Sequence, residues 1–134
     1  MVVGEAVIAA GIGCRRGASG VEVSAAVETA LETHGLEMTA LSALATARMK
    51  QGEAGIIVAG AALGLPVILV DDAALKEMEE RTLSQSAQSL AAAGTPSVSE
   101  AAALAAAGEG SRLLGPRIVV GNVTCALAIG GDGA

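Results

Sequence analysis

The most informative segment of this chain reads Gly11-Ile12-Gly13-Cys14-Arg15-Arg16-Gly17-Ala18-Ser19-Gly20. An apolar run over residues 2–10 precedes it and predicts a buried first strand. Ser19 and Glu22 form a capping box, S-x-x-E, which predicts a helix that starts directly after Ser19 and ends at Gly35. A strand, a glycine-rich loop and a capped helix in succession are typical of an open α/β sheet, which binds its ligands at the carboxyl edge of the strands.

The rest of the chain alternates between strand and helix patterns. We expect further strands over 36–44, 66–70 and 113–114, and a hairpin of 116–120 with 123–129 about Gly121-Asn122. Helices are expected to end at Leu63, at about Glu80, at Ala93 and at Ala107. These elements predict a single domain over 1–134 of the α/β class, a three-layer α/β/α fold whose sheet is mixed and mainly parallel and ends in an antiparallel hairpin.

The composition excludes several kinds of function. The chain has no Phe, Tyr or Trp, although 52% of its residues are hydrophobic. No base can therefore stack on an aromatic side chain, no aromatic cage can hold a quaternary ammonium group, and no Tyr can act as an acid or base. The formal net charge of -6 disfavours nonspecific binding to nucleic acid or to anionic membranes.

The same residues predict where the protein works. The longest uncharged apolar stretch, 56–70, contains glycines and a proline and falls short of the roughly 20 residues that a membrane span requires. No basic run precedes an apolar core at the N-terminus, so Cys14 and Cys125 are expected to be free thiols of a cytoplasmic protein. His34 and two distant cysteines do not make a zinc site, and we expect neither a metal nor another cofactor.

The glycine-rich segment is the first candidate site. Backbone N–H groups at a helix N-terminus favour an anion, and Arg15 and Arg16 add two guanidinium groups that match carboxylates or phosphates. Gly11, Gly13 and Gly17 would let the backbone approach a ligand closely. The alternative is a turn that merely requires glycines, with solvated arginines. The spacing matches neither the Walker motif nor the dinucleotide fingerprint.

Arg48 and Lys50 follow the second expected strand and could lie at the same sheet edge. Four cations converging there in an acidic protein would indicate a polyanionic ligand, whereas the alternative is a solvated helix turn.

Other polar residues allow two interpretations each. Cys14 lies beside Arg15 near a helix N-terminus, which would lower the pKa of its thiol, but it could also be a small residue at a turn. Ser97 and Glu100 form a second capping box, which we expect to be mainly structural, although Thr95 and Ser97 could bind a ligand through hydrogen bonds. Cys125 alternates with apolar neighbours and is expected in the core, and His34 is expected at the surface at a helix C-terminus.

The chain resembles the CobE and CbiG C-terminal domain family of cobalamin biosynthesis over almost its whole length. The first string that carries the resemblance is Gly11-Ile12-Gly13-Cys14-Arg15-Arg16-Gly17-Ala18-Ser19. The others follow in order: Leu44-Ala45-Thr46, Lys50 and Glu53, Leu63-Gly64-Leu65-Pro66, Gly94-Thr95-Pro96-Ser97-Val98-Ser99-Glu100-Ala101-Ala102-Ala103-Leu104, and Val123-Thr124-Cys125-Ala126-Leu127-Ala128. The resemblance is strongest to the standalone members of the family, of the CobE kind.

This resemblance implies an α/β domain that binds or carries a polycarboxylate corrinoid or precorrin intermediate of the aerobic pathway, with other pathway enzymes as further partners. The residue patterns and the resemblance together predict a ligand-binding set of Gly11, Gly13, Cys14, Arg15, Arg16, Gly17, Ser19, Thr46, Lys50, Thr95, Ser97 and Glu100.

Two other functions stay open. The resemblance to CbiG allows a hydrolase that acts on a precorrin lactone, in which Glu53, Glu100 or Cys14 would provide the base or nucleophile, although no catalytic residue is assigned. The third possibility is a noncatalytic partner that stabilises pathway enzymes. At Gln51-Gly52 the chain departs from the more acidic pair that is frequent in the family, which weakens any role for a carboxylate there.

Overall fold

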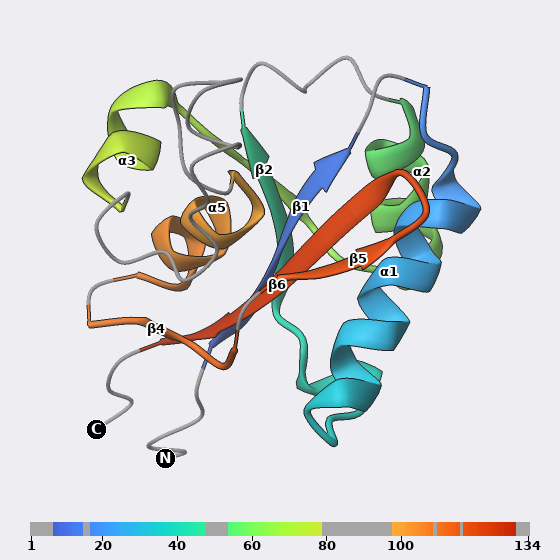
Figure 1. The fold of residues 1–134 in the computed structure, drawn as a ribbon, viewed down its shortest axis with the longest axis horizontal. Helices are drawn as coiled ribbons and strands as arrows, with labels where there is room; N and C mark the ends of the chain where they lie inside the picture. The colour runs from blue at the N-terminus through green and yellow to red at the C-terminus, as the bar shows by residue number, and fades with distance from the viewer. Residues whose placement is uncertain are drawn as a thin grey trace.

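A six-stranded mixed sheet forms the centre of the protein in a computed structural model, which describes residues 7–14, 17–47, 54–78, 98–108, 110–115 and 117–130 (Figure 1). The elements are, in chain order, β1 (Ile8–Cys14), α1 (Gly20–Thr33), a short 3₁₀ helix (Met38–Ala40), β2 (Ala43–Ala47), α2 (Ala54–Leu63), β3 (Val67–Val70), α3 (Asp72–Glu77), α5 (Val98–Ala107), β4 (Arg112–Leu113), β5 (Ile118–Val120) and β6 (Val123–Ile129).

The strand order is β3-β2-β1-β6-β4, and β5 also pairs with β6. Strands β1, β2 and β3 are parallel, whereas β6 is antiparallel to each of β1, β4 and β5. Among the strands that the structure describes, β6 alone therefore runs against the common direction. This arrangement confirms the prediction of a mixed, mainly parallel sheet with a C-terminal antiparallel hairpin.

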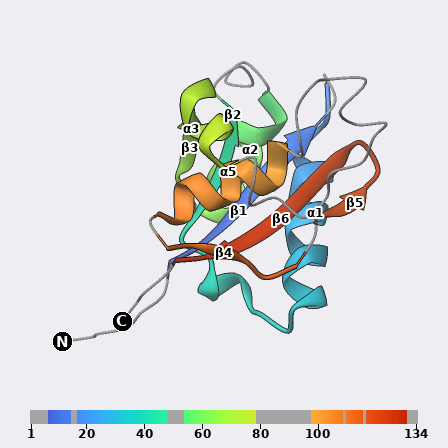
Figure 2. The same ribbon diagram turned by 60° about the vertical axis from the view of Figure 1, so that its left-hand side comes forward.

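Helices cover both faces of the sheet, as Figures 1 and 2 show. Successive side chains of β1 point to opposite faces of the sheet and so contribute to the helix layer on each side. Ile8, Ala10 and Ile12 belong to the hydrophobic core on the side of α1 and α2, together with Val23 and Val27 of α1. On the other side, small residues of β1 face α5, which packs across the middle of the sheet with α3 beside it. The small side chains let α5 approach the sheet backbone closely.

The helix signals in the sequence are confirmed where the structure describes them. Ser19 and Glu22 make both hydrogen bonds of the capping box. At the other end of α1, the Leu36 N–H donates to the carbonyl oxygen of Leu31 at 2.8 Å, and Gly35 has a φ of 68°. These features form a Schellman motif, which requires a left-handed residue that glycine adopts without strain.

Two strand predictions were wrong in their boundaries. The first strand is Ile8–Cys14 and extends past the expected end at Ala10, so Gly11 and Gly13 lie in the sheet and not in a loop. Glycine is a weak strand former, but β1 is paired on both sides, with β2 and with β6. The second strand begins at Ala43 and not at 36, because the 3₁₀ turn Met38–Ala40 comes first.

Helix α3 ends at Glu77, slightly before the expected end. The helix predicted to end at Ala93 lies outside the described residues. Within the ranges that the structure describes, no helix combines the length and apolar character that crossing a bilayer demands.

Candidate functional site

The carboxyl edge of the parallel strands is the best candidate for a ligand site. Because β1, β2 and β3 run in the same direction, their ends at Cys14, Ala47 and Val70 lie at one edge, which is at the top of Figure 1. Helices α1, α2 and α3 begin shortly after those strand ends, so their N-termini face this edge. Ser99, in the first turn of α5, lies beside Gly13 near the end of β1. The dipoles of α1 and α2 therefore favour an anionic ligand at this edge, whereas the N-terminus of the short helix α3 is already capped by the Asp71 carboxylate, which accepts a hydrogen bond from the Ala74 N–H at 3.0 Å.

Several of the predicted site residues lie outside the described residues. They are Arg15, Arg16, Lys50, Thr95 and Ser97, together with Arg48 and Glu53, and for Cys14 only the backbone is described. In the sequence, residues 15–16 directly follow β1, and residues 48–53 connect β2 to α2. Convergence of the cations on one site thus stays a prediction.

Gly11 and Gly13 have a packing role that the sequence did not reveal. A methyl group on Gly11 would collide with the carbonyl oxygen of Ser99 and would lie 2.7 Å from the backbone nitrogen of Ala103. One on Gly13 would lie 2.7 Å from Oγ1 of Thr124, which donates a hydrogen bond to the Gly13 carbonyl oxygen. These two glycines therefore let α5 and the Thr124 side chain of β6 pack directly against the backbone of β1.

Gly17 differs from the other two glycines of this motif. Its φ is 87°, and a methyl group there would have no neighbour within 4 Å. Glycine is favoured at this position because the backbone is left-handed. Of the three glycines, Gly17 thus belongs to the turn that leads into α1.

Ser19 and Glu22 connect the first turn of α1 with the β5–β6 hairpin. The Ser19 N–H donates to Oε1 of Glu22 at 3.0 Å, and the Glu22 N–H donates to Oγ of Ser19 at 3.1 Å. Nδ2 of Asn122 donates to Oε2 of the same carboxylate at 3.2 Å. The hydrogen bond from the Ser19 backbone, followed by weaker ones from Asn122, lowers the pKa of Glu22. The sequence predicted the capping box and the hairpin turn, but the link between them was missed because no local pattern encodes a contact between distant residues.

Thr46 and Glu100 are both buried and hydrogen-bonded. Oγ1 of Thr46 donates to the Ile12 carbonyl oxygen at 2.8 Å and so joins β2 to β1 near their carboxyl ends. The Glu100 side chain is 0% exposed, and its Oε2 accepts a hydrogen bond from the Arg117 N–H at 2.8 Å. Every buried side-chain nitrogen and oxygen in the described part of the chain has a partner. These contacts give both residues a structural role.

Cys125 lies in the core, as predicted. Its side chain is fully buried, and this burial raises the pKa of the thiol to about 12. The thiol is therefore protonated at neutral pH and is a poor nucleophile.

His34 caps the C-terminal end of α1, as expected, and is half-buried there. Its ring packs against Gly115, where a methyl group would lie 2.9 Å from Cε1 of His34. In the part of the chain that the structure describes, no group of three or more His, Cys, Asp or Glu side chains is placed to hold a metal ion.

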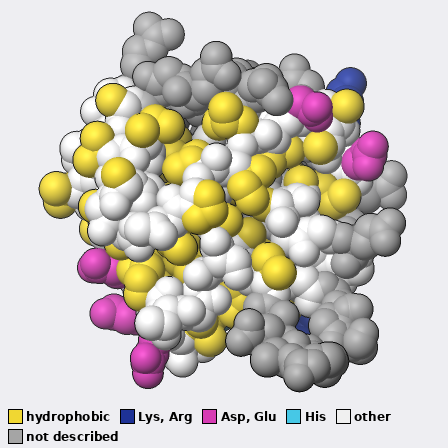
Figure 3. Space-filling view, turned by 180° about the vertical axis from the view of Figure 1, so that it is seen from behind, with side chains coloured by type: hydrophobic (Ala, Val, Ile, Leu, Met, Phe, Trp, Pro, Cys, Tyr) yellow, Lys and Arg dark blue, Asp and Glu magenta, His cyan; other side chains and the backbone are white. Residues whose placement is uncertain are grey.

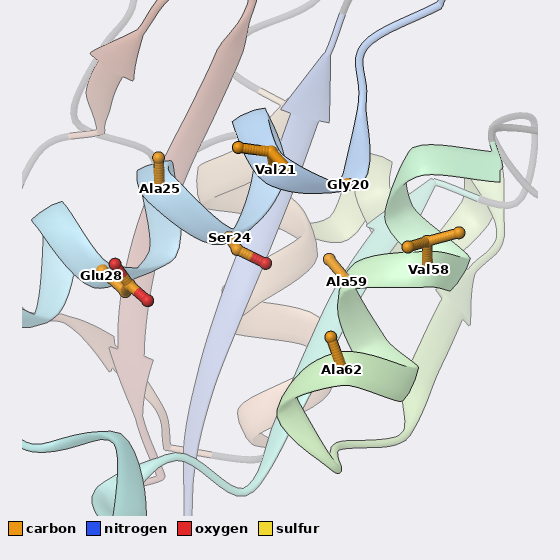
Figure 4. Close-up of a pocket in the computed structure, with 8 residues that line it drawn as sticks. All are labelled: Gly20, Val21, Ser24, Ala25, Glu28, Val58, Ala59 and Ala62. Carbon is orange, nitrogen blue, oxygen red and sulfur yellow. The ribbon is translucent and has the colours of Figure 1, made fainter.

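A shallow depression of about 290 Å³ lies between α1 and α2 (Figure 4). Its lining is mostly apolar and includes Val58, Ala59 and the single carboxylate of Glu28. Val21 and Val58 are 80% and 55% exposed beside it. Figure 3, a view from behind, shows apolar side chains spread over that face with acidic ones at its border. A polyanion is therefore better accommodated at the sheet edge than in this depression.

Comparison with known families agrees with this architecture. A family model described as "Cobalamin synthesis G C-terminus" matches residues 8–128. The chain therefore belongs to the family of CbiG C-terminal domains. It is a protein of the cobalamin biosynthesis pathway, of the CobE and CbiG kind.

Solved structures give the same result. CobE, a protein from the cobalamin (vitamin B12) biosynthetic pathway, is 38% identical with a TM-score of 0.86, and the alignment covers 96% of this chain and 94% of CobE. The cobalamin biosynthesis protein chiG from Agrobacterium tumefaciens str. C58 is 44% identical with a TM-score of 0.75, over 93% of this chain and 99% of that one.

A putative cobalamin biosynthesis protein G homolog from Sulfolobus solfataricus shares the fold, with 21% identity and a TM-score of 0.71 over 91% of this chain and 36% of that chain. Among curated proteins, no match to this chain was found.

Proposed function

We propose that this protein binds a polycarboxylate corrinoid or precorrin intermediate at the carboxyl edge of its sheet and carries it between enzymes of the pathway. One observation supports this proposal above all: the N-termini of α1 and α2 follow the ends of β1 and β2 at the same edge, and in the sequence Arg15, Arg16 and Lys50 come directly after those two strands. Both the helix dipoles and the cations favour a ligand with several negative charges.

The chemistry of the ligand fits such an edge. Corrin precursors carry many carboxylate side chains around an apolar macrocycle. Guanidinium groups can pair with those carboxylates in a bidentate geometry, and backbone N–H groups near Gly17 and Ser19 can add hydrogen bonds. Because the chain has no aromatic residue, the macrocycle would contact aliphatic side chains and backbone.

The described residues favour binding over hydrolysis. A general base must come within hydrogen-bond distance of its substrate. Glu100 is fully buried with its carboxylate hydrogen-bonded to the Arg117 N–H, and Cys125 is a protonated core thiol. Of the three candidates for a base or nucleophile, Glu53, Glu100 and Cys14, the burial of Glu100 leaves Cys14 and Glu53.

The role of the arginines can be tested with the double variant Arg15→Ala, Arg16→Ala. Hydrogen bonds to charged groups contribute about 1.5–3 kcal/mol each, so loss of both side chains should weaken binding of hydrogenobyrinic acid at least about tenfold in calorimetry. Arg112→Ala is the matched control, because Arg112 is exposed and pairs with Ile129 near the amino end of β1. Equal affinities of the wild type and the double variant would place the ligand elsewhere.

A further inference from the structure

A single carboxylate, that of Glu22, joins two segments that are 100 residues apart in the sequence. Its Oε1 accepts the hydrogen bond from Ser19, at the end of the basic glycine-rich segment, and its Oε2 accepts the one from Asn122, in the hairpin turn. We call these three residues the Glu22 clasp. A capping box needs only the first of these two hydrogen bonds. The second is therefore additional to what α1 requires for its own stability.

The clasp lies at the proposed ligand edge. In the pairing of β1 with β6, Cys14 is opposite Val123, so the hairpin turn is beside the end of β1, where Arg15 and Arg16 follow in the sequence. Gly121 has a φ of 59°, and a methyl group on it would lie 3.4 Å from Oε2 of Glu22. The Glu22 carboxylate therefore packs directly against the backbone of the hairpin turn at Gly121.

The same segment is held from the side of α2 as well. A methyl group on Gly55, in the first turn of α2, would collide with the carbonyl oxygen of Ala18 and would lie 3.0 Å from the carbonyl carbon of Ser19. Residues 18 and 19 therefore contact α2 on one side, and Ser19 is connected to the hairpin through Glu22 on the other.

We propose that Glu22 and Asn122 are positioning residues, which hold the end of the basic segment against the β5–β6 hairpin so that Arg15 and Arg16 are preorganised for a polycarboxylate ligand. This inference rests on the proposed function. Preorganisation strengthens binding because the segment loses less conformational entropy when the ligand arrives.

Variants at the two positions separate this role from helix capping. Asn122→Ala removes the side-chain hydrogen bond of the link but leaves the capping box in place, and Asn122→Asp puts a second carboxylate against Glu22. We expect Asn122→Ala to weaken binding of hydrogenobyrinic acid by about three- to tenfold and Asn122→Asp by more, with little change in Tm. Glu22→Gln alone should keep near-wild-type binding, because its amide can serve the capping box and pair with a flipped Asn122 amide. Glu28→Ala, on the exposed side of the same helix, is the control.

A second measurement needs no ligand. Amide hydrogen exchange over residues 15–19 should be faster in Asn122→Ala than in the wild type and unchanged in Glu28→Ala. If the wild type binds the corrinoid but neither affinity nor exchange changes in Asn122→Ala, the inference is wrong while the proposed function stands. If the wild type does not bind, the proposed function is wrong, and faster exchange would then support only the clasp as a constraint on the segment.

Discussion

Cys125 shows how an environment changes the chemistry of one residue. Its thiol lies among apolar residues of the core on the α1 side of the sheet, and burial raises its pKa from an ordinary value of 9.0 to about 12. The alternation of Cys125 with apolar neighbours already predicted this position, because a strand with one face on the core shows that pattern.

The raised pKa leads to a prediction at alkaline pH. Above pH 9 the unfolded chain loses the Cys125 proton while the folded protein keeps it, so the free energy of unfolding should fall as pH rises from about 9 toward 12. At pH 10 this residue should account for about 1.4 kcal/mol of the loss relative to pH 7. Denaturant titrations of the wild type and of Cys125→Ala at both pH values measure the effect, and an equal loss in both proteins would contradict it. The chain has no Tyr, so no phenol titrates in the same range.

Residues that act locally were the ones that the sequence predicted well. Ser19, Glu22 and Gly35 perform the capping roles expected of them, because a cap depends on a few neighbouring residues. Asn122 was expected in a turn, but its hydrogen bond to Glu22 depends on the whole topology and no local pattern could reveal it.

At the scale of elements, the packing of α5 on β1 explains the main correction. Glycines near a strand end indicated a loop, whereas Gly11 and Gly13 lie inside β1 with α5 directly above them. Sequence patterns distinguish poorly between a glycine that permits a turn and one that permits two backbones to approach. The ligand role predicted for these two residues therefore remains untested, while their packing role is seen in the structure.

Gly11→Ala tests the packing of these elements. The added methyl group would collide with Ser99 of α5, so the helix must move away from the sheet, and overpacking of this kind costs about 1–3 kcal/mol or more. In Gly64→Ala, by contrast, the methyl group meets no neighbour within 4 Å, and the penalty comes only from the φ of 72°. Denaturant unfolding should show the larger loss of stability for Gly11→Ala. A loss no greater than that of Gly64→Ala would mean that α5 does not pack on β1 as closely as the structure shows.

At the scale of the whole molecule, the alternation of strands and helices was enough to predict the fold class, the mixed sheet and the C-terminal hairpin. The strand order was not predicted, because it depends on how distant segments pack. The location and charge of the candidate site stay predictions. Its detailed arrangement depends in part on residues outside the described ranges.

The missing aromatic residues make the binding proposal unusually easy to test. The protein hardly absorbs near 280 nm, because the chain contains no Trp and no Tyr, so a bound corrinoid dominates the spectrum of the complex.

The most direct test is a titration of the purified protein with hydrogenobyrinic acid, followed by visible absorption and by co-elution of the colour with the protein in gel filtration. If the chain is a corrinoid carrier, the titration saturates with a Kd below about 100 μM, or roughly -5.5 kcal/mol. A spectrum that stays that of the free corrinoid, with no colour in the protein fraction, would contradict a carrier role.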